Sequence, residues 1–477
     1  MKNIIKSIIF QQDKSYFITG TTFTITMFFC LNIASCKKFL QIDPPISSLE
    51  QRVVFKNDGQ ATSAVIGMYS NMNAGYASGS RISVTNYAGL SADDMIGYNT
   101  FLPFYENQLS PDLSNITTLY SSMYKTIYTS NTIIEGLEES TGVTPAVKAQ
   151  LEGEAYFIRA FATFYLVNIF GPVPLQLTSD FRVTQLASRA PVDIIYKQII
   201  LDLKTAERLL IDSYPSPGRV RPNRSVAQAL LARTYLYIND WENAEKYSTL
   251  IIDKKSTYNL VGFDAVFLSN SQEAIWQLMP VAGTNAPDGS TFIPTLTAVP
   301  DVVSLRPDFV LNTFETSDKR LSSWVKSYTL GSITYYYPFK YKIKSASIAS
   351  EYSTVFRLAE LYLIRAEARI NRDDIINGIN DVNQIRLRPL GNGSNANVLN
   401  ILPTNMSKVN ALLAVEKERR NELFSEWGHR WFDLKRTSRA DIVLGVSKSF
   451  WQPTDKLYPI PTNELNRNLN IKQNEGY

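Results

Sequence analysis

The pattern that most limits how this chain can fold lies in the segment Ser225–Asp253. Apolar side chains recur there at helical spacing, pause at Asn239-Asp240 and then resume: Ala229, Leu230, Ala232, Tyr235, Leu236 and Tyr237, then Trp241, Ala244, Tyr247, Leu250 and Ile251. This spacing predicts two amphipathic helices joined by a tight turn. Small alanines allow the two helices to approach closely, and the large rings fill the groove opposite.

Other segments repeat this arrangement along the chain. Paired helices of this type resemble tetratricopeptide units, which have a period of about 34 residues. A second pair is predicted at Phe356–Ile370 and Ile375–Leu387, and a weaker third at Pro145–Phe170 and Pro191–Ile211. Further helices are expected at Ile116–Leu137 and after Asp58, which is placed to cap its helix. The prediction is a mostly α fold, an irregular tetratricopeptide-like helical-repeat scaffold over residues 58–261 and 351–450.

Two regions depart from the helical pattern. The stretch Asn73–Asn115 is rich in Gly and Asn and is expected to form long loops. Residues 262–350 are rich in Ser, Thr, Pro and Tyr, with short β-type runs at Ala274–Leu278, Trp324–Leu330 and Ser332–Tyr337, the last two joined at Gly331. We expect one domain, 58–477, in which 262–350 is a loop-rich, ligand-side insert with short β-hairpins and 451–477 is a tail. Loops carried on a rigid scaffold are where binding residues concentrate.

The N-terminus is typical of an exported lipoprotein. Lysines precede an apolar run that ends in Ala34-Ser35-Cys36, the form of a bacterial lipoprotein leader with its lipobox. A transmembrane anchor is the alternative, but polar residues interrupt the run, which falls short of the roughly 20 apolar residues that a span needs. We therefore expect residues 1–35 to be removed as a signal peptide, Cys36 to be lipidated, and residues 36–57 to form an extended tether.

Composition excludes several classes of function. The chain has 477 residues, two cysteines and one histidine, and because Cys30 lies in the leader, disulfides and zinc–thiolate sites are excluded. No basic run with interleaved aromatics suggests nucleic acid as a partner. No nucleophile elbow, phosphate-binding loop or zinc-helix motif is present, and no cofactor is predicted.

Charged residues in apolar surroundings are expected to be structural. Arg159, Arg420 and Arg430 lie among apolar residues, with acidic residues nearby in the sequence, so paired charges that lock helix contacts are predicted. His429 is likewise expected to be a packing residue. A glycosidase needs only two suitably spaced carboxylates, and Asp93-Asp94 is the acidic pair beside loop aromatics. A non-catalytic binder is favoured.

The candidate binding residues are aromatic and polar side chains of the two loop regions. A sugar needs a flat ring for its apolar C–H face and nearby amides or carboxylates for its hydroxyls. The candidates are Asp93, Asp94, Tyr98, Asn99, Phe101 and Tyr105 in the first region, and Trp324, Tyr335, Tyr336 and Tyr337 in the second, with Asn285 and Asp288 nearby. The prediction rests on the cluster, because any single ring is at least as often a core residue.

Five blocks in order behind the lipobox resemble one family. They are Glu154–Phe161 with Phe170–Leu175, the Ser225–Tyr247 pair, Arg357–Ala368, Glu418–Leu423 running into Gly428–Leu434, and Tyr458–Pro461 ending in Gly476-Tyr477. Together they resemble the SusD/RagB family of Bacteroidetes outer-membrane lipoproteins over essentially the whole mature chain.

The resemblance implies a lipid-anchored outer-membrane protein that faces the cell exterior. Such a protein captures oligosaccharides or polysaccharides without catalysis and delivers them to a SusC-type TonB-dependent transporter. Exterior display is implied by the resemblance alone, because Lys37-Lys38 follow the cysteine where acidic residues are frequent in surface lipoproteins. The alternatives are a RagB-like peptide-binding lid and a helical-repeat protein-interaction adaptor.

Overall fold

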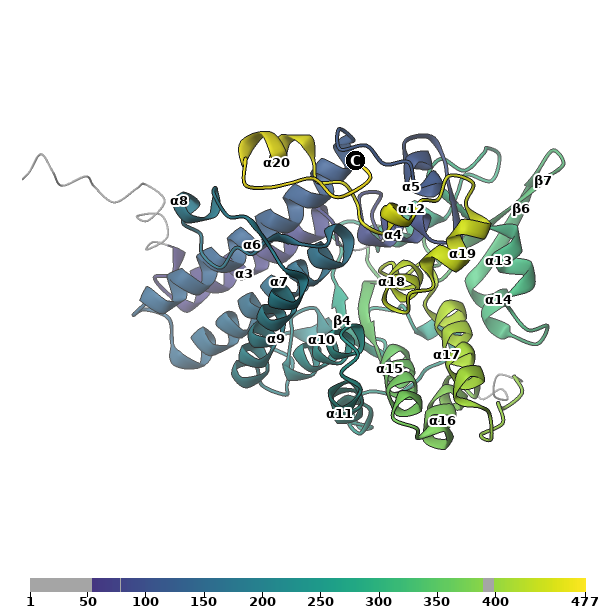
Figure 1. Cartoon of the computed structure of the whole chain (residues 1–477). Coiled ribbons are helices and arrows are strands. Elements are labelled where there is room, and N and C mark those ends of the chain that lie inside the picture. The colour runs from purple at the N-terminus through teal and green to yellow at the C-terminus, as the bar shows by residue number, and fades with distance from the viewer. Residues whose placement is uncertain (1–53, 78, 389–398) are drawn as a thin grey trace, which may run out of the picture. The chain divides into compact units, whose positions relative to one another are not determined.

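The computed structural model describes residues 54–77, 79–388 and 399–477 (Figure 1). The predicted signal peptide, Cys36 and the tether up to residue 53 lie outside the described residues. The last residues of the predicted tether already pack on the body, because Phe55 is buried against α6 (Ser114–Glu139) at Gly136. Within the described ranges, no helix is both long and apolar enough to cross a membrane.

A series of helices forms the scaffold, each packed against the next in chain order. Figure 1 shows them running from α3 and α6 through α10 and α11 to α17. The series consists of α3 (Asp58–Ala74), α6, α7 (Pro145–Phe170), α9 (Val192–Leu209), α10 (Arg224–Tyr237), α11 (Trp241–Ile252), α15 (Leu358–Asn371), α16 (Ile375–Arg386) and α17 (Lys408–Leu423). The mostly α, helical-repeat prediction is confirmed, including the pairs α10–α11, α15–α16 and α7–α9.

The α10–α11 pair shows why the sequence pattern succeeds. The turn contains Asn239 in the left-handed region, at φ 59°, and the Asp240 side chain caps α11 by accepting from the backbone N–H of Asn243 at 3.1 Å. Across the pair, the rings of Tyr235 and Tyr247 stack with centroids 5.6 Å apart. The alanines of α10 are buried, so the helices approach closely.

Two predicted helix starts are wrong, one because of local capping and one because of long-range strand pairing. Asn57 caps α3, accepting from the Gln60 N–H at 3.0 Å, whereas Asp58 is the first helical residue and its carboxylate accepts from Thr144. Phe356 and Arg357 belong to strand β8 (Ser353–Arg357) and not to the helix that follows. Strand β8 pairs with β4 (Ala274–Leu278), so long-range pairing decides the structure of residues that continue the apolar pattern of α15.

The expectation of long loops over Asn73–Asn115 is wrong in part. This region forms α4 (Val84–Ser91), β1 (Met95–Gly97), the 3-10 turn η2 (Asn99–Phe101) and α5 (Leu102–Glu106). Every residue of α4 is buried. A helix buried on all sides has no polar face, so it lacks the amphipathic period from which helices are predicted.

The insert supplies three strands of a four-stranded sheet and three short helices, and the fourth strand is β1. The sheet has the antiparallel order β1-β5-β7-β6, with β5 (Val303–Leu305), β6 (Val325–Leu330) and β7 (Ile333–Pro338). The helices are α12 (Pro287–Phe292), α13 (Pro307–Asn312) and α14 (Lys319–Trp324). The predicted hairpin at Gly331 is confirmed, but Trp324 ends α14 and does not begin the strand.

The remaining elements are short and lie between or after the scaffold helices. They are β2 (Val173–Pro174), α8 (Phe181–Thr184), β3 (Arg189–Ala190), η3 (Pro217–Arg219), η4 (Phe263–Ala265), α18 (His429–Arg436), α19 (Ala440–Ser447), η5 (Pro453–Lys456) and α20 (Thr462–Arg467). The C-terminal tail is tied to the scaffold: the Tyr458 N–H donates to the Ile169 carbonyl at 2.9 Å, and its hydroxyl lies 2.7 Å from that of Ser91.

A buried ion network fastens the insert to the scaffold. Glu422 of α17 accepts from Arg320 of α14 at 3.1 Å and from Arg357 of β8 at 2.6 Å. Arg388, which follows α16, donates to the same carboxylate at 2.5 Å. These four side chains are all buried, so the charges compensate one another away from water, as buried charges require.

Candidate functional site

The four-stranded sheet brings the two predicted loop regions together. Tyr98 directly follows β1, and Tyr335 lies in β7, with ring centroids 6.5 Å apart. The Tyr98 hydroxyl lies 2.9 Å from that of Ser304 in β5. Because β5 pairs with both β1 and β7, it holds the two tyrosines at fixed spacing.

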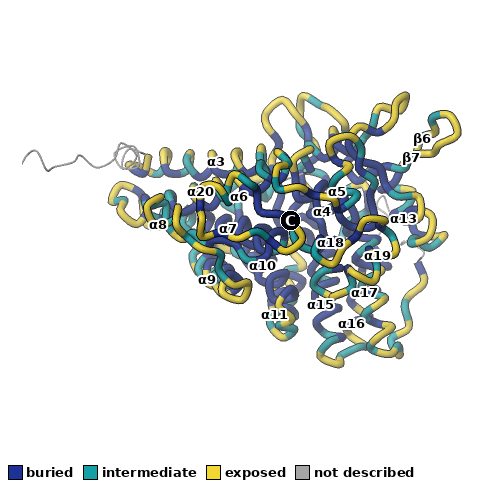
Figure 2. Tube along the Cα trace, turned by 45° about the horizontal axis from the view of Figure 1, so that its top comes forward, coloured by how far each residue is buried: buried dark blue, intermediate teal, exposed yellow. Residues whose placement is uncertain are grey.

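The β6–β7 hairpin adds a tyrosine that sequence reasoning missed. The hairpin turns at Gly331, whose φ of 62° suits a glycine, and its register places Tyr328 directly opposite Tyr335. The two rings stack with centroids 5.4 Å apart, and the Tyr328 hydroxyl donates to the Ala298 carbonyl at 2.6 Å. We call Tyr98, Tyr328 and Tyr335 the tyrosine platform. All three rings are partly exposed, on the part of the molecule where Figure 2 shows an exposed hairpin.

Polar side chains border the platform. Asn99 is exposed, and its amide nitrogen donates to the carbonyl and the carboxylate of Asp301, each at 3.2 Å. Arg81 pairs with the same carboxylate at 2.5 Å, and the side chains of Arg81 and Asp301 are 56% and 65% exposed. Arg81 and Asp301 were not predicted. They are 220 residues apart in the chain, so no local pattern in the sequence links them.

The platform combines flat apolar faces with hydrogen-bonding groups. Burial raises the pKa of Tyr98, partly offset by its hydrogen bond to Ser304, so the hydroxyl stays protonated at neutral pH. With the hydroxyls of Tyr98 and Tyr328 held by protein partners, their rings are fixed in orientation. Such an array can stack on an apolar face of a ligand while Asn99, Asp301 and Arg81 bond its polar groups.

Asp93 and Asp94 are not available to a ligand. Both are buried, and Arg430 donates to Asp93 and Arg420 to Asp94, each at 2.7 Å. Although burial opposes it, hydrogen bonding to Arg430 and the charges of Arg420 and Arg430 lower the pKa of Asp93 to about 2. The pair is therefore structural, and its place among the candidates is corrected.

Five predicted aromatic residues take core positions. Trp324 is fully buried among phenylalanines, and its indole N–H donates to the Phe263 carbonyl at 3.1 Å. Phe101 and Tyr337 are also buried. Tyr105 and Tyr336 are partly buried and pack against the core. Of the aromatic candidates, only Tyr98 and Tyr335 join the platform.

The other polar candidates are also occupied. Asn285 is buried and bonds Glu351 at 2.8 Å, and burial raises the pKa of Asp288 to about 6. The pairing expected for Arg159 is confirmed, but its partner is Asp202 at 2.7 Å and not the nearby Glu154, which pairs with Arg221. Burial, with the nearby charges of Arg233 and other cations, keeps the pKa of His429 well below its usual value, so the imidazole is neutral.

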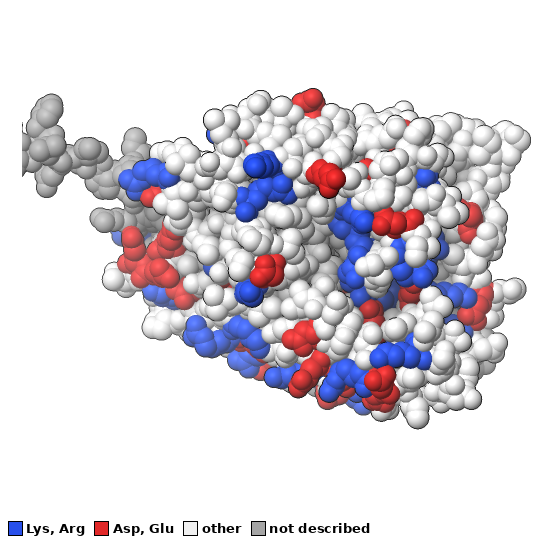
Figure 3. Space-filling model, viewed as in Figure 1, with Lys and Arg blue, Asp and Glu red and all other residues white. Residues whose placement is uncertain are grey.

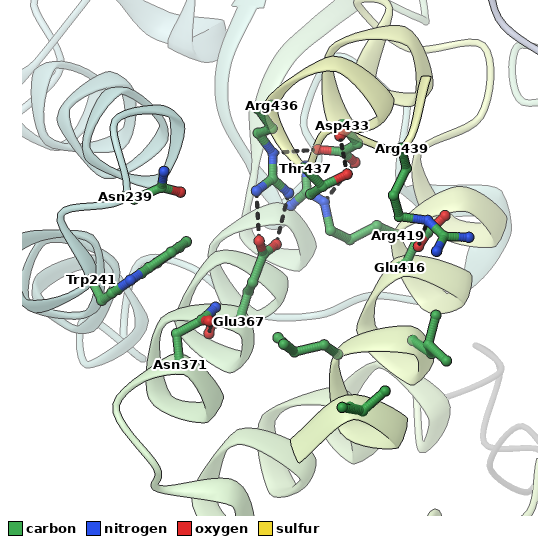
Figure 4. Close-up of a pocket in the computed structure, with 13 residues that line it drawn as sticks. Asn239, Trp241, Glu367, Asn371, Glu416, Arg419, Asp433, Arg436, Thr437 and Arg439 are labelled. Atoms are coloured by element: carbon green, nitrogen blue, oxygen red, sulfur yellow. Dashed lines mark hydrogen bonds and ion pairs between the residues drawn. The ribbon is translucent and has the colours of Figure 1, made fainter. Parts of the chain in front are cut away.

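Two of the cavities among the described residues are notable, and both lie apart from the platform. One, of about 360 Å³, has a wall of paired charges and an apolar floor from α17 (Figure 4). Figure 3 shows basic and acidic side chains gathered on the surface over α17 and α18. The other, of about 630 Å³, lies between α3, η3 and the end of β4 and is lined mainly by apolar residues; we call it the α3 cavity. Neither cavity is lined by a predicted site residue.

Arginines pair with both buried carboxylates in the charged wall of the smaller cavity, whereas Nη1 and Nη2 of Arg419 are buried without a hydrogen-bond partner. Arg436 bonds Glu367 at 2.5 Å and Asp433 at 2.8 Å, and Arg419 bonds Asp433 at 2.7 Å (Figure 4). These pairs join α15, α17 and α18 and leave the carboxylates committed to protein partners. Among the described residues, no group of three or more His, Cys, Asp or Glu side chains has the arrangement of a metal site.

Comparisons with known proteins match most of the chain to a single family. Residues 38–236 match a family model described as "Starch-binding associating with outer membrane", and residues 308–477 match the model of the SusD family. The chain is 23% identical to SusD-like protein P25 of Formosa agariphila, over 95% of this chain and 98% of that protein.

Solved structures show the same fold. A SusD superfamily protein from Bacteroides vulgatus has a TM-score of 0.75 at 22% identity, covering 89% of this chain and 100% of that one. The surface glycan-binding protein A from Bacteroides fluxus has a TM-score of 0.72 at 20% identity, covering 88% of this chain and 99% of that one.

Proposed function

The chain belongs to the SusD/RagB family, and from this premise we propose that it is a non-catalytic glycan-binding lipoprotein of the outer membrane. It captures oligosaccharides at the cell exterior and delivers them to a SusC-type TonB-dependent transporter. Lipidation of Cys36, which lies outside the described residues, anchors it.

The tyrosine platform is the observation that carries this proposal. It presents partly exposed rings from β6, β7 and the end of β1, at centroid spacings of 5.4 and 6.5 Å. The amide of Asn99 and the Arg81–Asp301 pair lie beside it. A few such contacts suit a capture protein, which must release its cargo: a dissociation constant between micromolar and millimolar corresponds to only about 4–8 kcal/mol.

Several observations support a binder over an enzyme. The acidic pair Asp93-Asp94 beside the loop aromatics is buried and bound by arginines. The acidic side chain beside the platform, Asp301, is exposed and paired with Arg81. A glycosidase needs two carboxyl groups that flank the scissile bond, one of them able to donate a proton. The described surroundings of the platform offer no such pair.

Affinity electrophoresis through gels that contain different polysaccharides tests the platform. At least one polysaccharide should retard the wild-type protein, and Tyr335→Ala and Tyr98→Ala should each reduce the retardation without a large loss of stability. Tyr128→Ala is the matched control, because Tyr128 is a tyrosine of α6 that is 50% exposed and distant in sequence from the platform. Equal retardation of all three variants would refute the proposed site.

The alternatives give different outcomes in solution. A peptide-binding lid would bind peptides and no polysaccharide, and an adaptor would copurify with a protein and show no response to sugar. Release of reducing sugar over time would identify an enzyme. The transporter partner is tested separately: affinity-tagged protein, solubilised from outer membranes in mild detergent, should copurify with a TonB-dependent barrel.

A further inference from the structure

An exposed apolar patch lies away from the platform. It begins with the loop that contains α8, where Leu177, Phe181, Val183 and Leu186 are 43%, 68%, 61% and 64% exposed. Large apolar side chains that cluster in this way on a surface mark contact with a membrane or another protein.

The C-terminal segment extends this patch. Asn468 and Asn470 donate to the backbone carbonyls of Ala187 and Leu186, each at 2.9 Å. Leu469 lies between these two asparagines and is 90% exposed. In Figures 1 and 2, α8 and α20 lie at the same end of the described body. We call Leu177, Phe181, Val183, Leu186 and Leu469 the α8 patch.

The patch adjoins the point at which the tether meets the body. Glu135 of α6 holds the α8 loop, accepting from the Thr178 hydroxyl at 2.7 Å and from the Ser179 N–H at 2.9 Å. The next residue, Gly136, has the ring of Phe55 where a side chain would be. Two consecutive residues of α6 thus contact the α8 loop and the last residues of the predicted tether.

From this arrangement we infer that the α8 patch contacts the lipid surface of the membrane that holds the anchor. The inference rests on the proposed lipidation of Cys36. The 18 residues from Cys36 to residue 53 span at most about 60 Å, so the anchored body stays close to the bilayer with this end near its tether. Exposed Phe and Leu side chains are those that enter the boundary between headgroups and acyl chains. Contact there would limit how freely the body moves on its tether.

A single-cysteine probe tests the inference on the whole lipidated protein. Cys30 leaves with the leader and Cys36 is consumed by the lipid, so an engineered cysteine is the one free thiol. An environment-sensitive fluorophore is attached at Phe181→Cys or Leu469→Cys, and the protein is reconstituted in phosphatidylethanolamine–phosphatidylglycerol vesicles. Val446→Cys is the matched control, an apolar residue of α19 that is 90% exposed.

The expected result is a blue shift of the probes at positions 181 and 469, with loss of emission when brominated lipids are included, and no change at position 446. Equal behaviour at all three positions overturns the inference. A shift at position 181 that requires added transporter also overturns it and assigns the patch to a protein partner. Protein that does not float with the vesicles overturns the proposed anchoring through Cys36. Glycan binding is tested independently of this result, by gel retardation.

Discussion

Replacing Glu422 by glutamine tests how strongly the buried ion network holds the insert to the scaffold. Although burial opposes it, the guanidinium groups of Arg388, Arg357 and Arg320 hold the pKa of Glu422 well below its usual range. The variant removes one negative charge from contact with three buried cations and turns an amide N–H₂ toward at least one of them.

The expected loss is that of one broken buried pair. Each arginine keeps another acid: Arg320 keeps Asp318 at 2.8 Å, Arg357 keeps Glu426 at 2.8 Å, and Arg388 keeps Glu273. The free energy of unfolding should therefore fall by about 3–5 kcal/mol and not by three times that amount. With an unfolding entropy of about 2 cal/mol/K per residue, Tm should fall by about 3–6 °C.

Urea and thermal unfolding at pH 7 measure this loss against a matched Glu→Gln control. Glu464 pairs at 3.6 Å with Arg467, whose side chain is 76% exposed, so Glu464→Gln should cost less than about 1 kcal/mol. Because the pKa of Glu422 is lowered on folding, its contribution is present above the unfolded pKa of about 4.3 and is lost as the pH falls below it. Equal unfolding midpoints for the two variants at pH 7 would refute the role given to the network.

Three further changes test other parts of the structure. Trp324→Ala should lower the free energy of unfolding by about 3–5 kcal/mol, because the indole is fully buried; a midpoint like that of wild type in urea would contradict its core position. Burial lowers the pKa of Lys448 to about 7, so between pH 7 and about 10 the unfolded chain binds more protons and stability rises with pH. Lys448→Met should flatten this rise in a pH series of urea midpoints, and an unchanged slope would count against it. Cys36→Ala should leave protein that incorporates no labelled fatty acid, and a labelled variant would disprove the lipidation site.

The scaffold helices were predictable because each has a periodic spacing of apolar residues in its own sequence. In α10 and α11 the spacing of alanine, leucine and tyrosine reports one packed face, and Asn239-Asp240 marks the turn. Helix α4 was missed because all of its residues are buried. The strands β1 and β5 are three residues each, and their pairing joins segments about 200 residues apart, which no local pattern shows.

The site was predictable only where local geometry fixes it. The glycine turn at residue 331 was recognised, and its register would have placed Tyr328 opposite Tyr335. Trp324 was misplaced because its burial depends on Phe263, Phe267 and Phe424, which come from distant parts of the chain. The sequence shows that a residue is aromatic, but tertiary packing decides whether the face of its ring is exposed to a ligand.

A crystal structure with an oligosaccharide from the retarding polysaccharide tests the central claim most directly. We predict that a sugar ring lies within about 4 Å of the faces of Tyr98, Tyr328 or Tyr335, with hydroxyls bonded to Asn99 or Asp301. An oligosaccharide bound in the α3 cavity, with the tyrosine platform empty, would contradict it.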